Sequence, residues 1–493
     1  LAGWQDEDYW ERWFSGSRRG FDLPGYDVLD AGAKDEQKAE GTGSEWALRS
    51  FFGRINYNYK ERYLFEANIR YDGSSRFAKG HRWGLFPSFS GGWRISEEAF
   101  WEPLRSTFDN FKIRASWGQL GNQNIGTYPF DSFVNLALPY VFNSSPYNGA
   151  ALQAMANNRI SWEKTEMTNF GVDFTLFKNL QVTFDYYIKN TSDILLKLDV
   201  PKIIGLTAPY QNAGKVRNKG WELALNYGDK VNDFSYNIGF NLSDVKNKVI
   251  DLKGINSDGL VVNHEGYSMN SIYALEAIGF FTSEDQLNNH AKQYGNYSLG
   301  DIMYKDQLTI DTDGDGIPDE GDGVINDDDK VIVGNSIPRF TFGLSTYLSW
   351  KNFDFNMLLQ GVGKADGYLY SQAVMPFYLG GTATEGHKDY WSEDNPNATY
   401  PRLAFNEPNN EKHSTFWMKN AAYLRVKNVQ IGYNIPKKIL QNCGIQSTRI
   451  YVSGQNLFSF DSFWDGFDVE SAVGRGNHYP QVRSFSVGLD VKF

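Results

Sequence analysis

The sequence is poor in cysteine, histidine and long apolar runs, and each shortage excludes a class of protein. Its single cysteine, Cys443, cannot build an internal disulfide framework. The six histidines are scattered and show no ligand spacing. No stretch approaches the roughly 20 apolar residues that a membrane helix needs. Acidic residues outnumber basic ones, 59 to 48, and no basic stripe is present, so we expect no nucleic-acid partner.

The chain is instead rich in aromatic residues, many of which alternate with polar ones. Aromatic side chains make up 16% of the sequence. In the final stretch, RSFSVGLDVKF, every second residue from Phe485 to Phe493 is apolar, and those between are small, polar or charged. This period of two is typical of a β-strand with one apolar and one polar face. The pattern therefore predicts a strand that runs to the last residue.

The same alternation recurs along the chain and predicts an all-β fold. RYLFEANIRY, NFGVDFTLF, LQVTFDYYI and RFTFGLSTYLSW are clear examples. Long amphipathic helical patterns do not occur in the sequence. The predicted strands number thirteen, near residues 51–60, 62–72, 83–96, 111–119, 165–177, 180–190, 216–228, 233–244, 338–350, 353–363, 423–435, 448–457 and 483–493.

The spacing of these strands favours a transmembrane antiparallel β-barrel. Tight turns alternate with long segments at 118–164, 191–215, 245–337, 364–422 and 458–482. Outer-membrane barrels have this asymmetry, with short periplasmic turns and long extracellular loops. Soluble β-sandwiches or propeller blades are the alternative, but they rarely gather Tyr, Phe and Trp so densely on one register. We therefore expect a protein of the bacterial outer membrane, with its C-terminus on the periplasmic side.

The count of thirteen raises a difficulty, because bacterial single-chain barrels use an even number of strands. An open edge in lipid would also leave backbone groups unpaired. Residues 1–47 are polar and irregular in sequence, so we expect them to form an extracellular loop segment. Residues 48–493 would then be the C-terminal portion of a larger transmembrane β-barrel, in a chain that begins within an outer loop.

Six stretches, taken in order, resemble the SusC-like branch of the TonB-dependent outer-membrane transporters. They are SEWALRSFFGRINYNYKERYLFEANIRYDGSSRF, WGLFPSFSGGWRISEE, WEKTEMTNFGVDFTLFKNLQVTFDYYIKNTSDILL, NAGKVRNKGWEL, NPNATYPRL and LRVKNVQIGYNIPKKI with IYVSGQNLFSF. The resemblance implies a plugged barrel of about 22 strands, of which this chain would hold the last ~13. It also implies that the terminal aromatic, Phe493, is the signal that the outer-membrane assembly machinery reads.

The resemblance further implies a function and partners. It implies TonB-dependent import of oligosaccharides or other nutrient oligomers across the lipid bilayer of the outer membrane, together with a SusD-like surface lipoprotein. Import of peptides by the same architecture is an alternative. We expect the plug and the first barrel strands to come from the N-terminal piece of the same precursor as a separate chain. Contact with the TonB complex would be made through that missing N-terminal region.

The sharpest local motif is DTDGDGIPDEGD, residues 311–322. Carboxylates lie at positions 1, 3, 5, 9 and 12, and Gly316 lies at position 6, where an EF-hand-type loop turns sharply. The predicted oxygen ligands of a structural Ca²⁺ are Asp311, Asp313, Asp315, Asp319 and Asp322, with the carbonyl of Ile317. The motif is also similar to the calcium repeats of thrombospondin type.

Two features depart from the EF-hand loop, since Pro318 follows position 7 and position 12 is Asp instead of Glu. A solvated acidic loop without an ion is the alternative. The run Asp327, Asp328 and Asp329 follows closely and could complete the site, form a second one, or be solvated.

The aromatic and polar segment DSFWDGFDVESAVGRGNHYPQ predicts contacts with a transported solute. Aromatic faces with polar neighbours suit sugars and peptides. The candidate substrate residues are Trp464, Phe467, Asp468, Arg475, Asn477, His478 and Tyr479. Packing of one loop against another is the alternative for all of them.

An enzyme is not expected, because the sequence has neither a phosphate-binding loop context nor a nucleophile elbow. Besides the importer, two other functions stay open at this point. One is a passive structural or adhesive outer-membrane barrel, and the other is a secreted calcium-binding β-enzyme.

Overall fold

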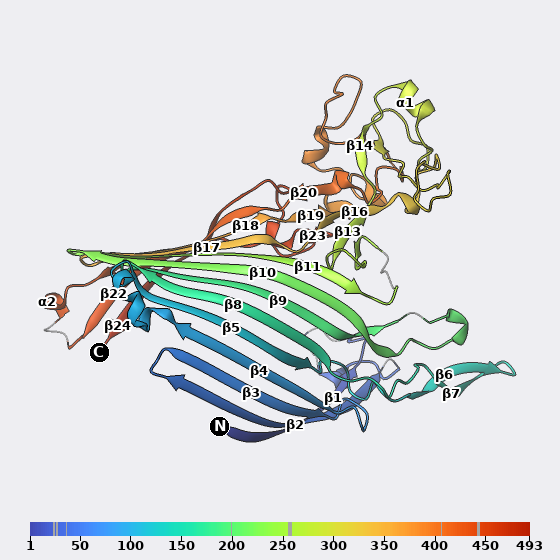
Figure 1. Ribbon diagram of the computed structural model, residues 1–493. Helices are drawn as coiled ribbons and strands as arrows, with labels where there is room; N and C mark the ends of the chain where they lie inside the picture. The colour runs from blue at the N-terminus through green and yellow to red at the C-terminus, as the bar shows by residue number, and fades with distance from the viewer. Residues whose placement is uncertain are drawn as a thin grey trace.

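The computed structural model describes the whole chain except residues 23, 24, 26, 27, 36, 199, 255–258, 406 and 441–443. Cys443 thus lies outside the described residues. Within them, fourteen strands form one antiparallel sheet, and each pairs with its neighbours in chain order (Figure 1). These strands are β1 (Ala2–Ser17), β2 (Lys38–Tyr59), β3 (Tyr63–Ser74), β4 (Trp83–Arg94), β5 (Phe108–Asn122), β8 (Glu163–Leu176), β9 (Leu180–Lys197), β10 (Tyr210–Val231), β11 (Phe234–Asp251), β17 (Arg339–Trp350), β18 (Phe353–Lys364), β21 (Tyr423–Asn434), β22 (Ser447–Asp461) and β24 (Ser484–Lys492).

The sheet is curved, and its two faces differ in chemistry because side chains alternate along each strand. Phe51 pairs with Tyr71 and Ile55 with Ala67 on the convex face, where large apolar side chains are exposed. Asn56 pairs with Glu66 on the concave face, one residue out of step. The predicted all-β fold with one apolar and one polar register is therefore confirmed.

The links between strands also divide as predicted. Short turns, such as 177–179, 232–233 and 351–352, lie at one end of the sheet, which we call the short-turn end. The longest links all leave from the opposite, long-loop end (Figure 1). β24 descends from the long-loop end, so Phe493 lies at the short-turn end.

The long links carry small elements of their own. Their strands are β6 (Val134–Phe142), β7 (Ser145–Leu152), β12 (Val261–Val262), β13 (Ser271–Ala274), β14 (Ala277–Phe280), β15 (Ile302–Tyr304), β16 (Val331–Asn335), β19 (Asp366–Leu369), β20 (Met418–Asn420) and β23 (Val473–Gly474). Two short α-helices are described, α1 (Glu284–Asn289) in a long link and α2 (Lys437–Leu440) at the short-turn end. The short 3-10 helices are η1 (Leu29–Ala31), η2 (Ile95–Glu97), η3 (Ala99–Leu104), η4 (Lys202–Ile204), η5 (Asp327–Asp329), η6 (Ser371–Ala373), η7 (Tyr378–Gly380), η8 (Glu385–Lys388), η9 (Thr415–Trp417) and η10 (Val469–Ser471).

The first 47 residues correct one prediction. Residues 2–17 form β1, and β2 begins at Lys38, so this segment is a hairpin and not an irregular loop. Alternation is hard to see there because most of β1 pairs with the part of β2 that precedes Phe51, beyond the apolar surface of the sheet. Trp4 lies opposite Phe51, at the limit of that apolar surface. Two residues further along β1, Asp6 already forms an ion pair with Arg49 at 2.6 Å.

The sheet therefore has fourteen strands. The prediction of thirteen was wrong because it missed β1. The parity argument for additional strands loses its basis with it. In the described part of the chain, β1 and β24 still form the two edges of the sheet. Several strands also run past their predicted limits toward the long-loop end; β9 reaches Lys197 and β11 reaches Asp251.

No helix among the described residues combines the length and the apolar character that crossing a bilayer requires.

Candidate functional site

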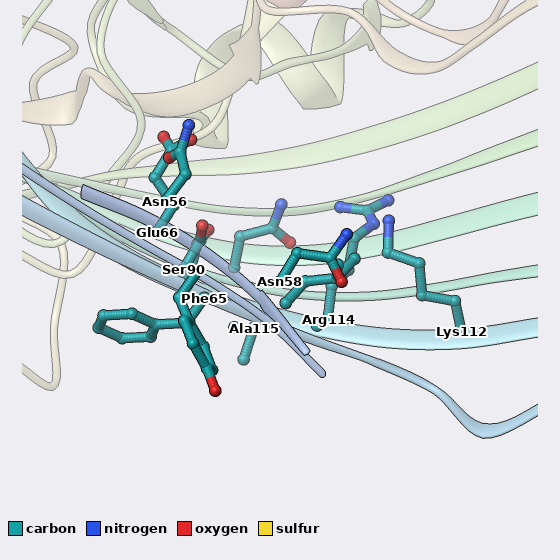
Figure 2. A pocket seen from close by; sticks show the side chains of 14 residues that line it. Asn56, Asn58, Phe65, Glu66, Ser90, Lys112, Arg114 and Ala115 are labelled. Atoms are coloured by element: carbon teal, nitrogen blue, oxygen red, sulfur yellow. The ribbon is translucent and has the colours of Figure 1, made fainter. Parts of the chain in front are cut away.

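A cavity of about 450 Å³ lies on the concave face, in the half of the sheet near the short turns. Figure 2 shows Asn56, Glu66 and Ser90 pointing to one side of the sheet and Phe65 to the other. The polar side chains come from β2, β3 and β4, whose alternate residues face the cavity because the strands pair in register. The arrangement offers hydrogen-bonding groups to whatever fills the concave side.

Arg114 of β5 forms ion pairs with two carboxylates of the concave face. Its guanidinium donates two hydrogen bonds of 2.6 Å to the carboxylate of Asp185 and two, of 3.1 and 3.3 Å, to that of Asp173. Lys112 contacts the same Asp173 at 3.4 Å. These residues come from β5, β8 and β9, so the fork of Arg114 links three neighbouring strands. A planar five-donor group is suited to two carboxylates at once, which an ammonium is not.

A second cavity, of about 480 Å³, lies at the long-loop end of the concave face. Gln360 and Val362 of β18 and Tyr423 of β21 form its strand side. The turn η10, with Glu470, forms the opposite side, so the link between β22 and β24 covers the concave face here. Tyr423 donates a hydrogen bond of 3.1 Å to Glu470 and closes one corner.

The long links that surround this cavity share one hydrophobic core. Residues Trp417, Tyr304, Tyr368 and Leu275 are fully buried in it. They belong to the links between β11 and β17 and between β18 and β21, and Phe463 of the last link joins them. The three links therefore form a single packed unit, which we call the loop assembly.

Two buried polar residues of the loop assembly, Asp301 and His387, have hydrogen-bond partners within it. Asp301 is fully buried, and it accepts hydrogen bonds of 2.7 Å from Arg402 and 2.8 Å from Asn410. Buried charges persist only when they are paired in this way. His387 is buried too; its Nε2 lies 2.9 Å from the Val374 carbonyl, and burial lowers the pKa of its imidazole.

Arg425 ties the last long link to the sheet. It is almost completely buried on β21, and its guanidinium donates a 2.8 Å hydrogen bond to Asp468. Burial alone would raise the pKa of Asp468. The hydrogen bonds from Arg425 and from the Glu470 N–H outweigh that effect, so the pKa is lowered and the group stays ionised.

The structure divides the predicted substrate residues into two groups. Trp464 stacks on Trp417 with ring centroids 6.5 Å apart, and Phe467 packs against the same core. Together with Asp468, they serve the loop packing that was the alternative for this segment. The exposed group consists of Arg475, Asn477, His478 and Tyr479, and the side chain of Tyr479 is 87% exposed.

The aspartate-rich motif brings three of its predicted ligands together. Ligand oxygens of Asp311, Asp313 and Asp315 lie within 4.8 Å of one another, and all three side chains are exposed. Asp311 accepts hydrogen bonds from the N–H groups of Gly316 and Gly314, which lower its pKa. Hard carboxylate oxygens in such a group fit a calcium ion.

The other predicted ligands are engaged elsewhere. Among the described residues, the group of three carboxylates contains neither Asp319 nor Asp322. The carboxylate of Asp319 accepts a hydrogen bond of 2.7 Å from the Thr312 hydroxyl. Asp322 accepts from the Val324 N–H at 2.8 Å. The side chain of Ile317 is exposed, as a residue that offers only its carbonyl can be. In the following run, Asp329 is fully buried and accepts from the Gln307 N–H.

Sequence reasoning did not single out Arg114, Gln360, Val362 or Glu470. The alternation places the first three on the polar register, but it cannot tell which concave residues border a cavity. Glu470 faces the cavity only because the last long link packs against β21. That packing depends on contacts far apart in the sequence, such as Arg425 with Asp468.

Comparison with known proteins gives consistent results. The family described as TonB dependent receptor-like, beta-barrel matches residues 3–457. TonB-dependent receptor P3 of Formosa agariphila is 31% identical over 95% of this chain and 48% of its own length. TonB-dependent receptor SusC of Bacteroides thetaiotaomicron is 29% identical over 93% of this chain and 45% of its own length. The chain thus spans about half the length of these relatives.

The fold is similar to that of a solved structure, the RagAB peptide transporter. The superposition has a TM-score of 0.84 and covers 100% of this chain and 53% of the other, at 23% sequence identity. At this identity the likeness concerns the fold.

Proposed function

Since the chain belongs to the family of TonB-dependent receptor-like β-barrels, we propose that it forms part of the wall of an importer in the bacterial outer membrane. It is SusC-like in sequence and in fold. On this basis the convex face contacts lipid, the short-turn end is periplasmic and the long-loop end is extracellular. The proposal is one of transport and not of catalysis.

The two-faced sheet is the observation that carries the proposal. A wall between lipid and a polar passage must be apolar outside and polar inside, and the paired strands β2 and β3 have this division. The cavity beside Gln360 and Glu470 lies where a solute would pass between the extracellular loops and the concave face.

Oligosaccharides or similar nutrient oligomers are the cargo that we propose. The exposed Tyr479 and its neighbours Asn477 and His478 combine an aromatic face with hydrogen-bonding groups, and such surfaces suit sugar rings. Peptides would be bound by the same kinds of groups, so the uptake of labelled peptides is measured beside that of oligosaccharides.

The proposed complex has further members. A plug and additional strands would complete the barrel, since the relatives are about twice as long as the chain. A SusD-like lipoprotein would cover the extracellular loops, and TonB would supply the energy for import. The loop assembly supports the presence of a lipoprotein, because it presents a packed surface at the extracellular end on which a partner could rest.

Uptake of labelled oligosaccharides by cells that make the full-length protein tests the proposal. Gln360→Trp should reduce uptake because the indole would fill the extracellular cavity. Leu359→Trp is the matched control, since Leu359 pairs with Leu344 on the convex face. Labelled peptides taken up in place of oligosaccharides would change the cargo class. Equal uptake by both variants and the unaltered protein would contradict a solute path at this cavity.

We also propose that the aspartate-rich loop holds a structural Ca²⁺ through Asp311, Asp313 and Asp315, with water or further loop oxygens completing the shell. Extracellular calcium modules bind with dissociation constants of about 10⁻⁴–10⁻³ M. Calcium titration of the purified full-length protein should show one such site, and replacing all three aspartates by asparagine should abolish it. Replacing Asp327 and Asp328 is the control. No calcium binding by the unaltered protein would refute the site.

A further inference from the structure

Four basic side chains gather on the convex face at the extracellular end of β10 and β11. They are Arg217, Lys219, Lys246 and Lys248, and all four are exposed. They share the register of the apolar residues below them, since Trp221 and Lys219 are two residues apart on β10. We call these four residues the basic patch.

The members of the basic patch face one another in like-charged pairs. Lys219 lies directly opposite Lys246, and Arg217 directly opposite Lys248, in the pairing of β10 with β11. Like charges at directly opposite positions destabilise a strand pair. A bound anion between the two strands would remove this repulsion.

The basic patch has no carboxylate of its own. In the described part of the chain, none of its four residues forms an ion pair, although Arg217 donates a 2.7 Å hydrogen bond to Asn190. One acid on this face, Asp244, lies within electrostatic range of Lys246. That carboxylate is buried and already holds the guanidinium of Arg339 by two hydrogen bonds.

The height of the basic patch matches the outer surface of the bilayer. On the convex face of β11, apolar residues alternate from Phe234 to Leu242, and Asp244 is the first charge. Ten residues at about 3.3 Å each, on a strand tilted by about 40°, rise roughly 25 Å, which is the height of the apolar band of outer-membrane barrels. Lys246 and, opposite it, Lys219 therefore lie just above that band, at the level of the lipid head groups.

We propose that the basic patch binds the phosphate groups of a lipid in the outer leaflet of the outer membrane. The face on which the patch lies is the lipid-facing one, so the molecule beside it at this height is a lipid. Lysine and arginine side chains suit phosphate oxygens, and Arg217 adds a fork that can hold two of them. This inference rests on the membrane position of the sheet and is independent of what the protein transports.

Native mass spectrometry of the full-length protein, titrated with diphosphoryl lipid A in mild detergent, tests the proposal. Each basic residue at a membrane surface contributes about fivefold to anion affinity, so the double variant Lys219→Gln/Lys246→Gln should bind about 30-fold more weakly. Lys219→Arg/Lys246→Arg should keep the affinity. The matched control is Lys437→Gln/Lys438→Gln, two exposed lysines on the short-turn side, where affinity should not change.

Three further arms decide the source of the anion. Phosphate-free lipid A and phosphatidylcholine should bind no better to the unaltered protein than to the double variant. Inorganic phosphate at millimolar concentration should not displace lipid A. Equal loss in the control variant, unchanged affinity in Lys219→Gln/Lys246→Gln, displacement by free phosphate, or an acidic protein retained in place of lipid would each overturn the proposal. Circular dichroism of each variant verifies that the barrel is folded.

Discussion

Leu225 provides the sharpest test of which face of the sheet meets lipid. It lies on the convex face of β10, opposite Phe240 of β11 and Val182 of β9. Phe240 is six residues from Phe234 and four from Asp244, so Leu225 lies about 15 Å above the lower limit of the apolar band and about 10 Å below the upper one. A lysine at such a depth costs about 2–4 kcal/mol on the lipid side of a barrel. Leu225→Lys should therefore lower the free energy of unfolding by that amount.

Ala224 is the matched control, because it is the preceding residue and faces the concave side. It lies opposite Thr183 and Asn241 and is exposed there, so Ala224→Lys places the ammonium among polar groups. We expect a change below about 1 kcal/mol, as for a surface substitution. Urea-dependent unfolding of the full-length protein in lipid vesicles measures both values. If the two lysines destabilise the protein equally, or if Ala224→Lys is the more costly, the assignment of the two faces is refuted.

Three other predictions concern the packed and charged groups. Arg114→Gln should lower the free energy of unfolding by about 1–3 kcal/mol in urea titrations, since two half-buried carboxylates lose their guanidinium partner. Lys112→Gln, which removes one 3.4 Å contact, should cost less than about 1 kcal/mol. Trp417→Ala should destabilise the loop assembly by about 3–5 kcal/mol, seen as faster hydrogen exchange in all three links, and protection lost from one link alone would contradict a shared core. Burial lowers the folded-state pKa of His387, so the unfolded state binds its proton first and stability should fall as pH drops below the ordinary value of 6.5; limited proteolysis at pH 7.5 and 5.5 measures this, and equal rates would contradict it.

The alternation of apolar and polar residues is enough to predict most of the large sheet. It succeeds where a strand crosses the apolar band, as in β17, because lipid imposes the pattern there. It fails for β1, since most of that strand lies beyond the band, where nothing forces alternate residues to be apolar. The ends of β9 and β11 near the long loops were not predicted either, because they also lie beyond the apolar band.

The candidate site was less predictable than the sheet. Trp464 and Phe467 have the composition of a sugar-binding surface, yet both pack into the loop assembly. Composition describes what a side chain can do, and only long-range contacts determine whether it is free to do it. The aspartate motif is a local pattern within twelve residues, so its first three carboxylates could be placed together from the sequence. Asp319 could not, because the Thr312 side chain competes for it.

The shared core of the three long links has a consequence for how such proteins diversify. Trp417, Tyr304 and Phe463 come from different links and belong to one buried cluster. The packing of each link therefore depends on the side chains that the other two supply. A single loop grafted from a relative would meet mismatched cavities and clashes, however well it suited a new cargo. If the chain lines the proposed importer, new specificities should therefore arise by exchange of all three links as a block, or by substitution of exposed residues such as Tyr479 that leave the core unchanged.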